Sequence, residues 1–539
     1  MYLQHSKPWP ENAVIYQVYP RSFYDSNNDG IGDLKGITQK LDYIASLGVD
    51  GIWISPFFMS PMKDFGYDVS DYCAVDPIFG TLEDFHELIH EAHKRDLKIM
   101  IDQVLSHTSD EHAWFSESKQ NKSNPKKNWY VWADAKEDGS PPNNWLSVFG
   151  GSAWEWEESR GQYYLHNFLT QQPDLNFHEP QVIKTLESVL SFWLDRGVDG
   201  FRLDAANFYL HDRLLRDNPI RKNGEPGAEG VPADNPYSRQ HHIYDKSQPE
   251  NLIILRHIRS IMDRYPNILT IGEVGDDNST ETSVAYCEHL NHVYSFKLLE
   301  LPFQDRLIQE TIEAFEKAFS KNTPCYSFSN HDVVRAITRW GKEYPEKNFA
   351  KLLITMLLTL RATVFIYQGE ELGLSESDIP FEKIQDPYGK EFYPKFKGRD
   401  GCRTPLPWKQ DQANAGFSKS EPWLPVDENH YTKAIEQQTS EALSLLNYYR
   451  ELIHWRKKQP ALQKGDLQFL DSSEGALVYV RRNEEQILLI ILNLSNQQKT
   501  FDLNAYPHYS ILCDLNIDIM LEGSRLKLSP FGFALLDIT

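Results

Sequence analysis

Residues 198–204 read VDGFRLD, a short apolar run that ends in an arginine and an aspartate. Three further apolar runs also lead into acidic motifs: KIMI at 98–101 precedes DQVLSH, ILTI at 268–271 precedes GEV, and CYSF at 325–328 precedes SNHD. In a barrel of parallel strands, catalytic side chains stand at the carboxyl ends of the strands. Four strand ends therefore offer carboxylates to one mouth, and this arrangement predicts the fold.

Strand-like runs alternate with helical ones along most of the chain. VIYQV at 14–18 and GIWI at 51–54 precede an amphipathic helix expected at 83–94. The later runs HVYSF at 292–296 and TVFIY at 363–367 bring the number of strands to eight. Because strands separated by helices run parallel, we expect an α/β protein with a (β/α)8 TIM barrel.

One long interruption and one change of period divide the chain into domains. After residue 103 the rhythm breaks into Pro, Gly, Asn and Trp for far longer than an ordinary loop of about 2 to 6 residues. After the helix that ends near residue 458, apolar residues recur with a period of 2. We expect a catalytic barrel over 1–103 and 180–459, an inserted subdomain B over 104–179, and a C-terminal β-sandwich domain over 460–539.

The composition fits a large soluble enzyme that binds a neutral ligand. The 539 residues carry a formal charge of -22, which argues against nucleic acid and anionic membranes as partners. No run of about 20 apolar residues is present, and the N-terminus lacks the pattern of a secretion signal. The five cysteines are scattered without metal-ligand spacing, so we expect free thiols and a cytoplasmic protein.

The VDGFRLD motif places two charged groups on one side of a strand. Side chains alternate faces along a strand, so Arg202 and Asp204 point one way. A carboxylate beside a fixed cation stays ionised, which suits a nucleophile, although a structural salt bridge is the alternative interpretation. Glu273 lies one step past the apolar part of its own strand, where it can act as general acid and then base. Taken alone, it could equally be a loop carboxylate.

The motifs in combination resemble a known family. DQVLSH, GFRLDAANF, EVGDD and FSNHD are similar, in the same order, to the four signature segments of the α-amylase family, glycoside hydrolase family 13. The segments YQVYPRSF, GYDVSDY and RDGCRTPLPW extend the resemblance over essentially the whole chain. Within that family the chain most resembles the bacterial α-glucosidase and oligo-1,6-glucosidase group, which acts on short substrates from the non-reducing end.

The resemblance implies roles for individual residues. Asp204 would be the nucleophile, Glu273 the acid/base, and Asp332 a third carboxylate that stabilises the transition state. Phe149 and Phe168 would form aromatic walls, and only one of the two arginines of the RDGCR segment would touch the sugar. The full set of implied substrate-binding residues is Asp64, Tyr67, His107, Phe149, Phe168, Arg202, His331, Arg399 and Arg403.

The position after the implied nucleophile bears on linkage. Members of the family that prefer α-1,6 bonds often carry Val there, whereas α-1,4 enzymes carry smaller residues. This chain has Ala205, followed by Ala206. We therefore expect a preference for α-1,4 bonds.

The loop DSNNDGIGD at 25–33 is a candidate metal site. Oxygen ligands stand at alternate positions and Gly30 lies at the turn, as in calcium loops. No Glu stands at position 12 and the preceding residues are not helical, so the loop is not an EF-hand. The resemblance implies a structural Ca²⁺ or Mg²⁺ remote from the chemistry, and no organic cofactor. The expected ligands are Asp25, Asn27, Asp29, Ile31 and Asp33.

These observations predict a retaining, exo-acting α-glucosidase that hydrolyses maltose-like disaccharides, short oligosaccharides or glucosides, with transglucosylation as a side activity. The partners would be small neutral α-glucosides, and the protein a monomer or homodimer. One alternative is a glucosyltransferase of the same family, of the sucrose isomerase or trehalose synthase type. A non-catalytic carbohydrate-binding homologue is the second alternative.

Overall fold

We analysed a computed structural model that describes residues 7–222, 224–232, 234–341, 346–512 and 517–539. Eight parallel strands form one sheet in the order β11-β10-β9-β5-β2-β1-β13-β12. The ends of this order, β11 and β12, contact each other and close the sheet into a barrel. The strands are β1 (Val14–Val18), β2 (Gly51–Ile54), β5 (Lys98–Gln103), β9 (Gly200–Leu203), β10 (Leu269–Val274), β11 (His292–Ser295), β12 (Cys325–Tyr326) and β13 (Thr363–Tyr367).

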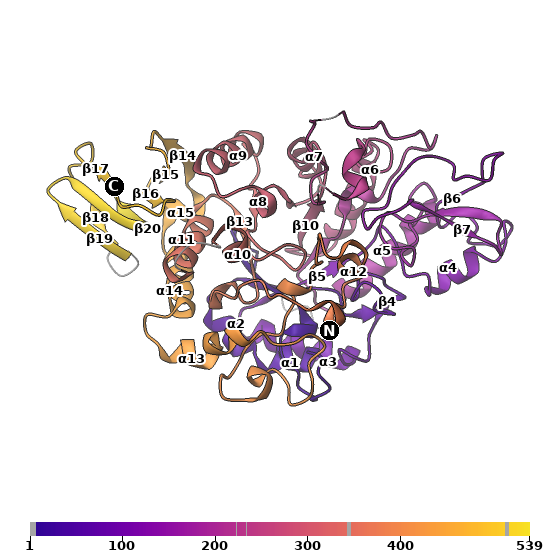
Figure 1. Ribbon diagram of the computed structural model, residues 1–539, viewed down its shortest axis with the longest axis horizontal. Coiled ribbons are helices and arrows are strands. Elements are labelled where there is room, and N and C mark those ends of the chain that lie inside the picture. The colour runs from indigo at the N-terminus through magenta and orange to yellow at the C-terminus, as the bar shows by residue number, and fades with distance from the viewer. Residues whose placement is uncertain (1–6, 223, 233, 342–345, 513–516) are drawn as a thin grey trace.

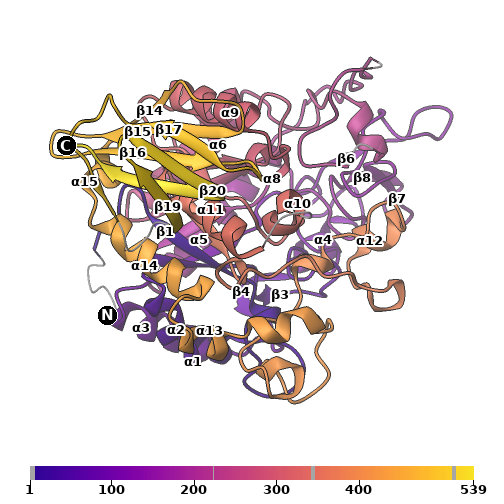
Figure 2. The same ribbon diagram turned by 60° about the vertical axis from the view of Figure 1, so that its left-hand side comes forward.

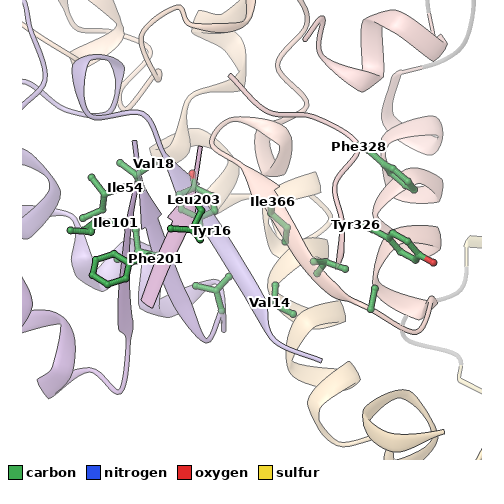
Figure 3. Close-up of a cluster of buried hydrophobic side chains, with 14 of the residues drawn as sticks. Val14, Tyr16, Val18, Ile54, Ile101, Phe201, Leu203, Tyr326, Phe328 and Ile366 are labelled. Carbon is green, nitrogen blue, oxygen red and sulfur yellow. The ribbon is translucent and has the colours of Figure 1, made fainter. Parts of the chain in front are cut away.

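Each barrel strand is buried on both faces, and the alternation of its side chains explains why. Phe201 and Leu203 of β9 lie in the large core between strands and helices, together with Ile101 of β5 and Ile54 of β2 (Figure 3). Met100 lies next to Ile101 on β5, and Ile271 pairs in register with Arg202, so both point to the opposite face and fill a separate cluster inside the barrel. The inner cluster closes the barrel below, so polar residues at the strand ends face a mouth on one side only.

Helices surround the barrel and cover the outer face of its strands (Figure 1). Helix α3 (Leu82–Lys94) begins with a capping box between Thr81 and Asp84, and it buries an apolar stripe that includes Phe85 and Leu88. The other long helices of the ring are α5 (Pro180–Leu194), α6 (Asn251–Met262), α7 (Ser279–Tyr286), α9 (Asp305–Ala318), α11 (Glu346–Thr359) and α14 (Leu445–Lys457).

Short helices connect these parts. The short α-helices are α1 (Leu34–Gln39), α2 (Leu41–Ser46), α4 (Ala113–Ser118), α8 (Lys297–Glu300), α10 (Ala336–Gly341), α12 (Pro387–Phe392), α13 (Ile435–Ser440) and α15 (Pro460–Lys464). The 3-10 helices are η1 (Pro20–Ser22), η2 (Ala206–Phe208), η3 (Pro236–Arg239), η4 (Glu370–Leu372), η5 (Phe381–Lys383), η6 (Asp400–Cys402), η7 (Ala413–Gly416) and η8 (Glu428–Lys433). Several of them lie in the loops that follow barrel strands.

Two smaller sheets lie within the inserted segment and beside it. The pair β3 (Phe58–Met59) and β4 (Asp71–Val75) follows the second barrel strand. The antiparallel sheet of β6 (Trp132–Ala133), β7 (Trp154–Glu157) and β8 (Gln162–Leu165) has its own core around Trp145 and Trp154. It lies at the opposite end of the molecule from the C-terminal sheet (Figure 1).

The C-terminal part is all-β, as predicted. Its strands are β14 (Asp466–Leu470), β15 (Ala476–Arg482), β16 (Ile487–Asn493), β17 (Lys499–Asp502), β18 (Ser510–Ile511), β19 (Ile517–Glu522) and β20 (Arg525–Asp537). The long β20 pairs antiparallel with four of them, and it turns at Phe531, whose φ of 56° is left-handed. The sheet packs on α9 and α11 (Figure 2), where the hydroxyls of Tyr479 and Thr359 are hydrogen-bonded at 2.6 Å.

Sequence and structure differ mainly in the lengths of elements. The predicted strand at 325–328 is paired only over Cys325–Tyr326, because the chain then leaves the sheet to carry Asp332 to the mouth. Among the residues that the structure describes, no helix is long and apolar enough to cross a membrane.

Candidate active site

A cavity of about 580 Å³ opens at the carboxyl ends of the barrel strands, and the three predicted catalytic acids line it. Asp204 follows β9, Glu273 lies on β10, and Asp332 follows β12. Of the predicted substrate residues, the wall also contains Asp64, Tyr67, His107, Phe149, Phe168 and Arg399. Residues from most of the chain length therefore meet in one place.

Arg202 lies buried beneath this cavity, and its guanidinium binds three carboxylates. Nη1 lies 2.8 Å from Asp102 Oδ1 and 2.7 Å from Asp204 Oδ1, and Nη2 lies 2.5 Å from Glu273 Oε1. Asp102 reaches the guanidinium because it pairs in register with Arg202 across β5 and β9. A single cation thus fixes the relative positions of Asp204 and Glu273.

Three carboxyl groups around one guanidinium cannot all ionise freely. Burial raises the pKa of Asp102 to about 6, although Arg202 opposes the shift. Burial also raises the pKa of Asp204 against the effect of Arg202, and the nearby Glu273 and Asp102 add to the rise. Arg202 favours the ionised form of Asp204, as the sequence predicted, but burial outweighs it, so Asp102 and Asp204 hold a proton more strongly than isolated carboxylates would.

Asp332 has the opposite electrostatic setting. Arg403 Nη2 lies 2.9 Å and Arg399 Nη1 lies 3.3 Å from its Oδ1, and His331 Nε2 lies 3.2 Å from its Oδ2. Burial disfavours the charged form, but His331 and the two arginines outweigh it and hold the pKa of Asp332 well below its ordinary value. Asp332 is therefore a permanent negative charge on the cavity wall.

A chain of hydrogen bonds joins the two acidic groups. His331 stacks on Tyr67 with ring centroids 5.3 Å apart, and burial lowers the pKa of His331 to about 3, so its ring is neutral. Gln17 Nε2 donates to His331 Nδ1 at 2.8 Å, which leaves the ring proton on Nε2, 2.6 Å from Tyr67 Oη. Tyr67 in turn donates to Asp102 Oδ2 at 3.0 Å. The ring and both acids are thereby held in fixed orientations.

The polar end of the cavity is built by an ion pair between distant segments. Arg399 Nη2 lies 2.7 Å from Asp64 Oδ1, and Gln172 Nε2 donates to Asp64 Oδ2 at 3.1 Å. Burial lowers the pKa of His107 to about 4, so this residue is neutral. These groups present fixed donors and acceptors of the kind that read sugar hydroxyls.

Aromatic rings enclose this polar end. Phe149 and Phe168 meet edge to face with centroids 5.8 Å apart, and Phe168 also contacts His107 at 5.2 Å. The guanidinium carbon of Arg399 lies 5.0 Å from the centroid of Phe149. Rings placed in this way exclude water from the polar groups that they border.

The outer part of the cavity is mainly apolar. Its wall contains Val231, Pro232, Phe208, Phe296, Leu299 and Val333. Two carboxyl groups, Glu229 and Glu300, interrupt this surface, and burial raises the pKa of Glu229 to about 7. Part of this wall comes from the long segment between β9 and α6, which covers the mouth from one side.

Three predicted substrate residues, Arg202, His331 and Arg403, are buried behind the wall instead of lining it. Arg403 donates from Nε to the His331 carbonyl at 2.7 Å, so it supports the acids from behind, whereas Arg399 faces the cavity. Arg399 is therefore the arginine placed to meet a ligand in the cavity, and its contact with the sugar stays a prediction.

Sequence reasoning missed several residues of the site, among them Gln17, Gln172 and Tyr294. Tyr294 Oη lies 2.9 Å from Glu273 Oε1. The run HVYSF at 292–296 already predicted its strand, but only the register Glu273↔Tyr294 shows that the two side chains meet. Gln172 lies in an irregular segment and had no comparable signal.

The predicted metal loop is organised by its own backbone. Asp25 Oδ2 accepts from the Gly30 N–H at 2.8 Å and Asp29 Oδ1 accepts from the Ile31 N–H at 2.8 Å, while Asn27 Oδ1 accepts from the Asp29 N–H at 2.9 Å. Asp33 caps helix α1 through Gly36. No three His, Cys, Asp or Glu side chains within the described ranges lie close enough together to hold an ion. The all-oxygen donor set suits Ca²⁺ or Mg²⁺, and binding stays a prediction.

Comparisons with known proteins agree with this geometry. The family model described as "Alpha amylase, catalytic domain" matches residues 17–465. The chain is 52% identical over 507 residues to "Probable alpha-glucosidase" of Rhizobium meliloti (strain 1021), covering 93% of this chain and 92% of the relative. It is 37% identical to an oligo-1,6-glucosidase of Heyndrickxia coagulans, with 92% and 93% covered. The solved structure of the alpha-glucosyl transfer enzyme XgtA is 49% identical, with a TM-score of 0.94 and 99% and 100% covered.

Proposed function

The chain belongs to the α-amylase family of glycoside hydrolases, and on that basis we propose that it cleaves the terminal α-glucosyl bond at the non-reducing end of short α-glucosides with retention of configuration. The enzyme is a glycoside hydrolase with α-glucosidase relatives. The proposed substrates are maltose-like disaccharides, short oligosaccharides and glucosides, with α-1,4 bonds preferred.

The main support for the proposal is that the guanidinium of Arg202 binds both Asp204 and Glu273. Its two terminal nitrogens hold Asp204 and Glu273 at 2.7 and 2.5 Å, so one guanidinium separates the two carboxyl groups. This suits the roughly 5 to 5.5 Å spacing of retaining glycosidases better than the roughly 6.5 to 9.5 Å of inverting ones, which must also admit a water molecule.

The first step forms a covalent intermediate. An Asp204 carboxylate oxygen attacks the anomeric carbon while the bond from that carbon to the leaving oxygen breaks. Glu273 gives its proton to the leaving oxygen, so the aglycone departs as a neutral alcohol or sugar. The permanent charge of Asp332 favours the positive charge that develops on the glucosyl ring.

The second step returns the enzyme to its starting state. Glu273, now a carboxylate, takes a proton from water, and the water oxygen attacks the anomeric carbon from the face that the aglycone left. The bond to Asp204 breaks and its electron pair returns to the carboxylate. The two inversions together release the glucosyl unit as α-glucose.

Time-resolved proton NMR of the purified protein with maltose tests the proposal. The reducing end of maltose is released as an α/β mixture, so we expect an initial excess of α-glucose over that mixture, which then mutarotates slowly. An initial excess of β-glucose over that mixture would contradict the retaining mechanism. No turnover of maltose or other α-glucosides would contradict the enzymatic assignment and favour a non-catalytic carbohydrate-binding protein.

Transglucosylation is the second candidate activity, and the apolar outer cavity is the observation that favours it. An acceptor that covers Phe208 and Phe296 would displace water from the glucosyl-enzyme. A structural relative with 49% identity is an alpha-glucosyl transfer enzyme. In the same NMR experiment, new disaccharide signals that exceed free glucose would move the assignment to a transferase or isomerase.

We further propose that the loop from Asp25 to Asp33 binds Ca²⁺ or Mg²⁺ as a structural ion. The support is its all-oxygen donor set and a backbone already turned by Asx hydrogen bonds. Thermal denaturation tests whether an ion binds here, because a ligand that binds the native state raises the melting temperature. We expect a rise with millimolar Ca²⁺ or Mg²⁺, reversed by EDTA and absent in Asp29→Ala. An unchanged melting temperature with both ions would contradict the site.

A cytoplasmic location and a monomeric or homodimeric state complete the proposal. Free cysteines at positions 73, 287, 325 and 402 support a reducing compartment, and Cys513 lies outside the described residues. Light scattering after size-exclusion chromatography measures the mass of the protein in solution and so tests the monomeric or homodimeric state. Cell fractionation tests the cytoplasmic location.

A further inference from the structure

Tyr294 contacts the proposed acid/base through its hydroxyl group. Its Oη lies 2.9 Å from Glu273 Oε1 and 3.1 Å from Arg202 Nη2. The side chain is 2% exposed and does not line the cavity. Its ring is packed against Phe365 at 5.7 Å and Trp53 at 6.5 Å. Tyr294 therefore cannot serve as part of the substrate-binding wall.

We propose that Tyr294 is a positioning residue for Glu273, which it orients so that the catalytic proton is carried by Oε2. The inference rests on the proposed glycosidase function. Without the Tyr294 hydroxyl, the carboxyl group would lose one of the two donors that fix which oxygen faces the cavity.

The direction of each hydrogen bond follows from donor chemistry. Arg202 has only donors, so its Nη2 donates to both Tyr294 Oη and Glu273 Oε1. The hydroxyl proton of Tyr294 is then free to point at Oε1. Burial raises the pKa of Tyr294 well above its ordinary value, against the effect of Arg202, so the hydroxyl keeps this proton at any working pH.

Two donors at Oε1 leave that oxygen no room for a proton of its own. Glu273 Oε2 accepts only a longer bond, 3.2 Å, from the Ala205 N–H among the described residues. Ala205 lines the cavity and its N–H meets Oε2, so Oε2 is the oxygen of Glu273 on the cavity side. Protonation at Oε2 places the acid where the leaving oxygen needs it.

Tyr294→Phe keeps the ring and removes only the donor. We expect kcat/KM for maltose to fall about 10- to 100-fold, within the range of general acid catalysis. With α-glucosyl fluoride, whose leaving group needs little protonation, we expect kcat/KM to fall by less than about 3-fold. A donor also favours the ionised carboxylate, so its loss should move the alkaline limb of the maltose pH profile to higher pH.

A control variant and a double mutant separate positioning from stability. Tyr448 also has a buried hydroxyl, 2.6 Å from Thr355 Oγ1 between helices α11 and α14, so Tyr448→Phe should leave both rates unchanged. In a Glu273→Gln background, Tyr294→Phe should cause no further loss with the fluoride. If the Phe variant does not fold, replacement of Tyr294 by 3-fluorotyrosine keeps the packing and strengthens the donor, and the alkaline limb should move to lower pH.

Three results would overturn the inference: equal losses on maltose and fluoride, no loss on either, or an unmoved alkaline limb. Failure of the proposed function would look different, because the unmodified enzyme would then turn over neither substrate.

Discussion

Arg399 and Asp64 lie 335 positions apart in the chain, and Arg399 Nη2 lies 2.7 Å from Asp64 Oδ1. The same guanidinium binds Asp386 through Nη2 at 2.9 Å and Nε at 3.1 Å, and it reaches Asp332 at 3.3 Å. One planar fork therefore ties the polar end of the cavity to a proposed catalytic acid. Lysine, a point charge, cannot reproduce these contacts.

Arg399→Lys should for this reason damage binding as well as catalysis. Charge-assisted bonds of this kind contribute about 1.5 to 3 kcal/mol each, so we expect kcat/KM for maltose to fall at least about 10-fold, with a higher KM. The inhibition constant of 1-deoxynojirimycin, which occupies the glucosyl end alone, should rise in parallel. Arg403→Lys is the matched comparison, because Arg403 lies behind the wall, and it should affect kcat more than inhibitor binding. Identical behaviour of the two variants would contradict the division of roles.

Asp204→Asn should abolish turnover while the fold survives. Loss of a nucleophile removes the covalent route, and we expect kcat for maltose to fall more than about 10³-fold. Three carboxyl groups compete for Arg202, so removal of one charge should leave the melting temperature equal or higher. Calorimetry and initial rates measure the two quantities. Retained activity would refute the assignment of the nucleophile.

The barrel could be predicted from sequence because burial on both faces leaves a strong local signal. The runs at β1, β2 and β13 coincide with the strands in the structure. Within VDGFRLD, strand alternation alone was enough to place Arg202 beside Asp204. Predictions of this kind need only the alternation of side chains along a single strand.

Contacts between elements were harder to predict, since they depend on register and on loop geometry. Arg399 and Arg403 flank the 3-10 helix η6, and both reach Asp332. They differ in their other partners, because Arg399 also binds Asp64 and Asp386 whereas Arg403 binds the His331 carbonyl. None of these partners is near in sequence. Strand β17 has one apolar residue, Phe501, and in β19 the apolar Met520 and Leu521 are exposed, so neither strand shows a clear apolar alternation in the sequence.

Glu370 should make stability depend on pH. Burial raises its pKa from 4.5 to about 8, although the Tyr367 N–H donates to its carboxyl group at 2.7 Å. The folded state therefore binds this proton more tightly than the unfolded state, and the stabilisation is complete below about pH 4.5 and lost as pH rises through 8. We expect the melting temperature to fall between pH 6 and 9, and to fall less in Glu370→Gln. Glu484 is exposed, so Glu484→Gln should leave the dependence of the melting temperature on pH unchanged. The same dependence in all three proteins would contradict the assignment of this effect to Glu370.

Ala205 links backbone strain to the choice of glycosidic bond. Its φ of 42° and ψ of 47° are left-handed, it lines the cavity, and its N–H donates to Glu273 Oε2. A β-branched residue is strained in this conformation, so Ala205→Val should lower the absolute rates on every substrate. The ratio of kcat/KM for maltose to that for isomaltose removes this common loss, because both sugars form the same glucosyl-enzyme.

The small side chain of Ala205 is expected to leave room for the α-1,4 aglycone. The extra methyl groups of Val should therefore lower the maltose to isomaltose ratio of kcat/KM by roughly 10-fold or more, since one or two methylenes have an effect of this size in a tight pocket. Ala205→Gly relieves the strain and adds no bulk, so it should leave the ratio near that of the unmodified enzyme. A Val variant with an unchanged ratio would mean that linkage is read elsewhere on the outer wall. The residues to test next would then be Phe208 and Phe296, which border the same space.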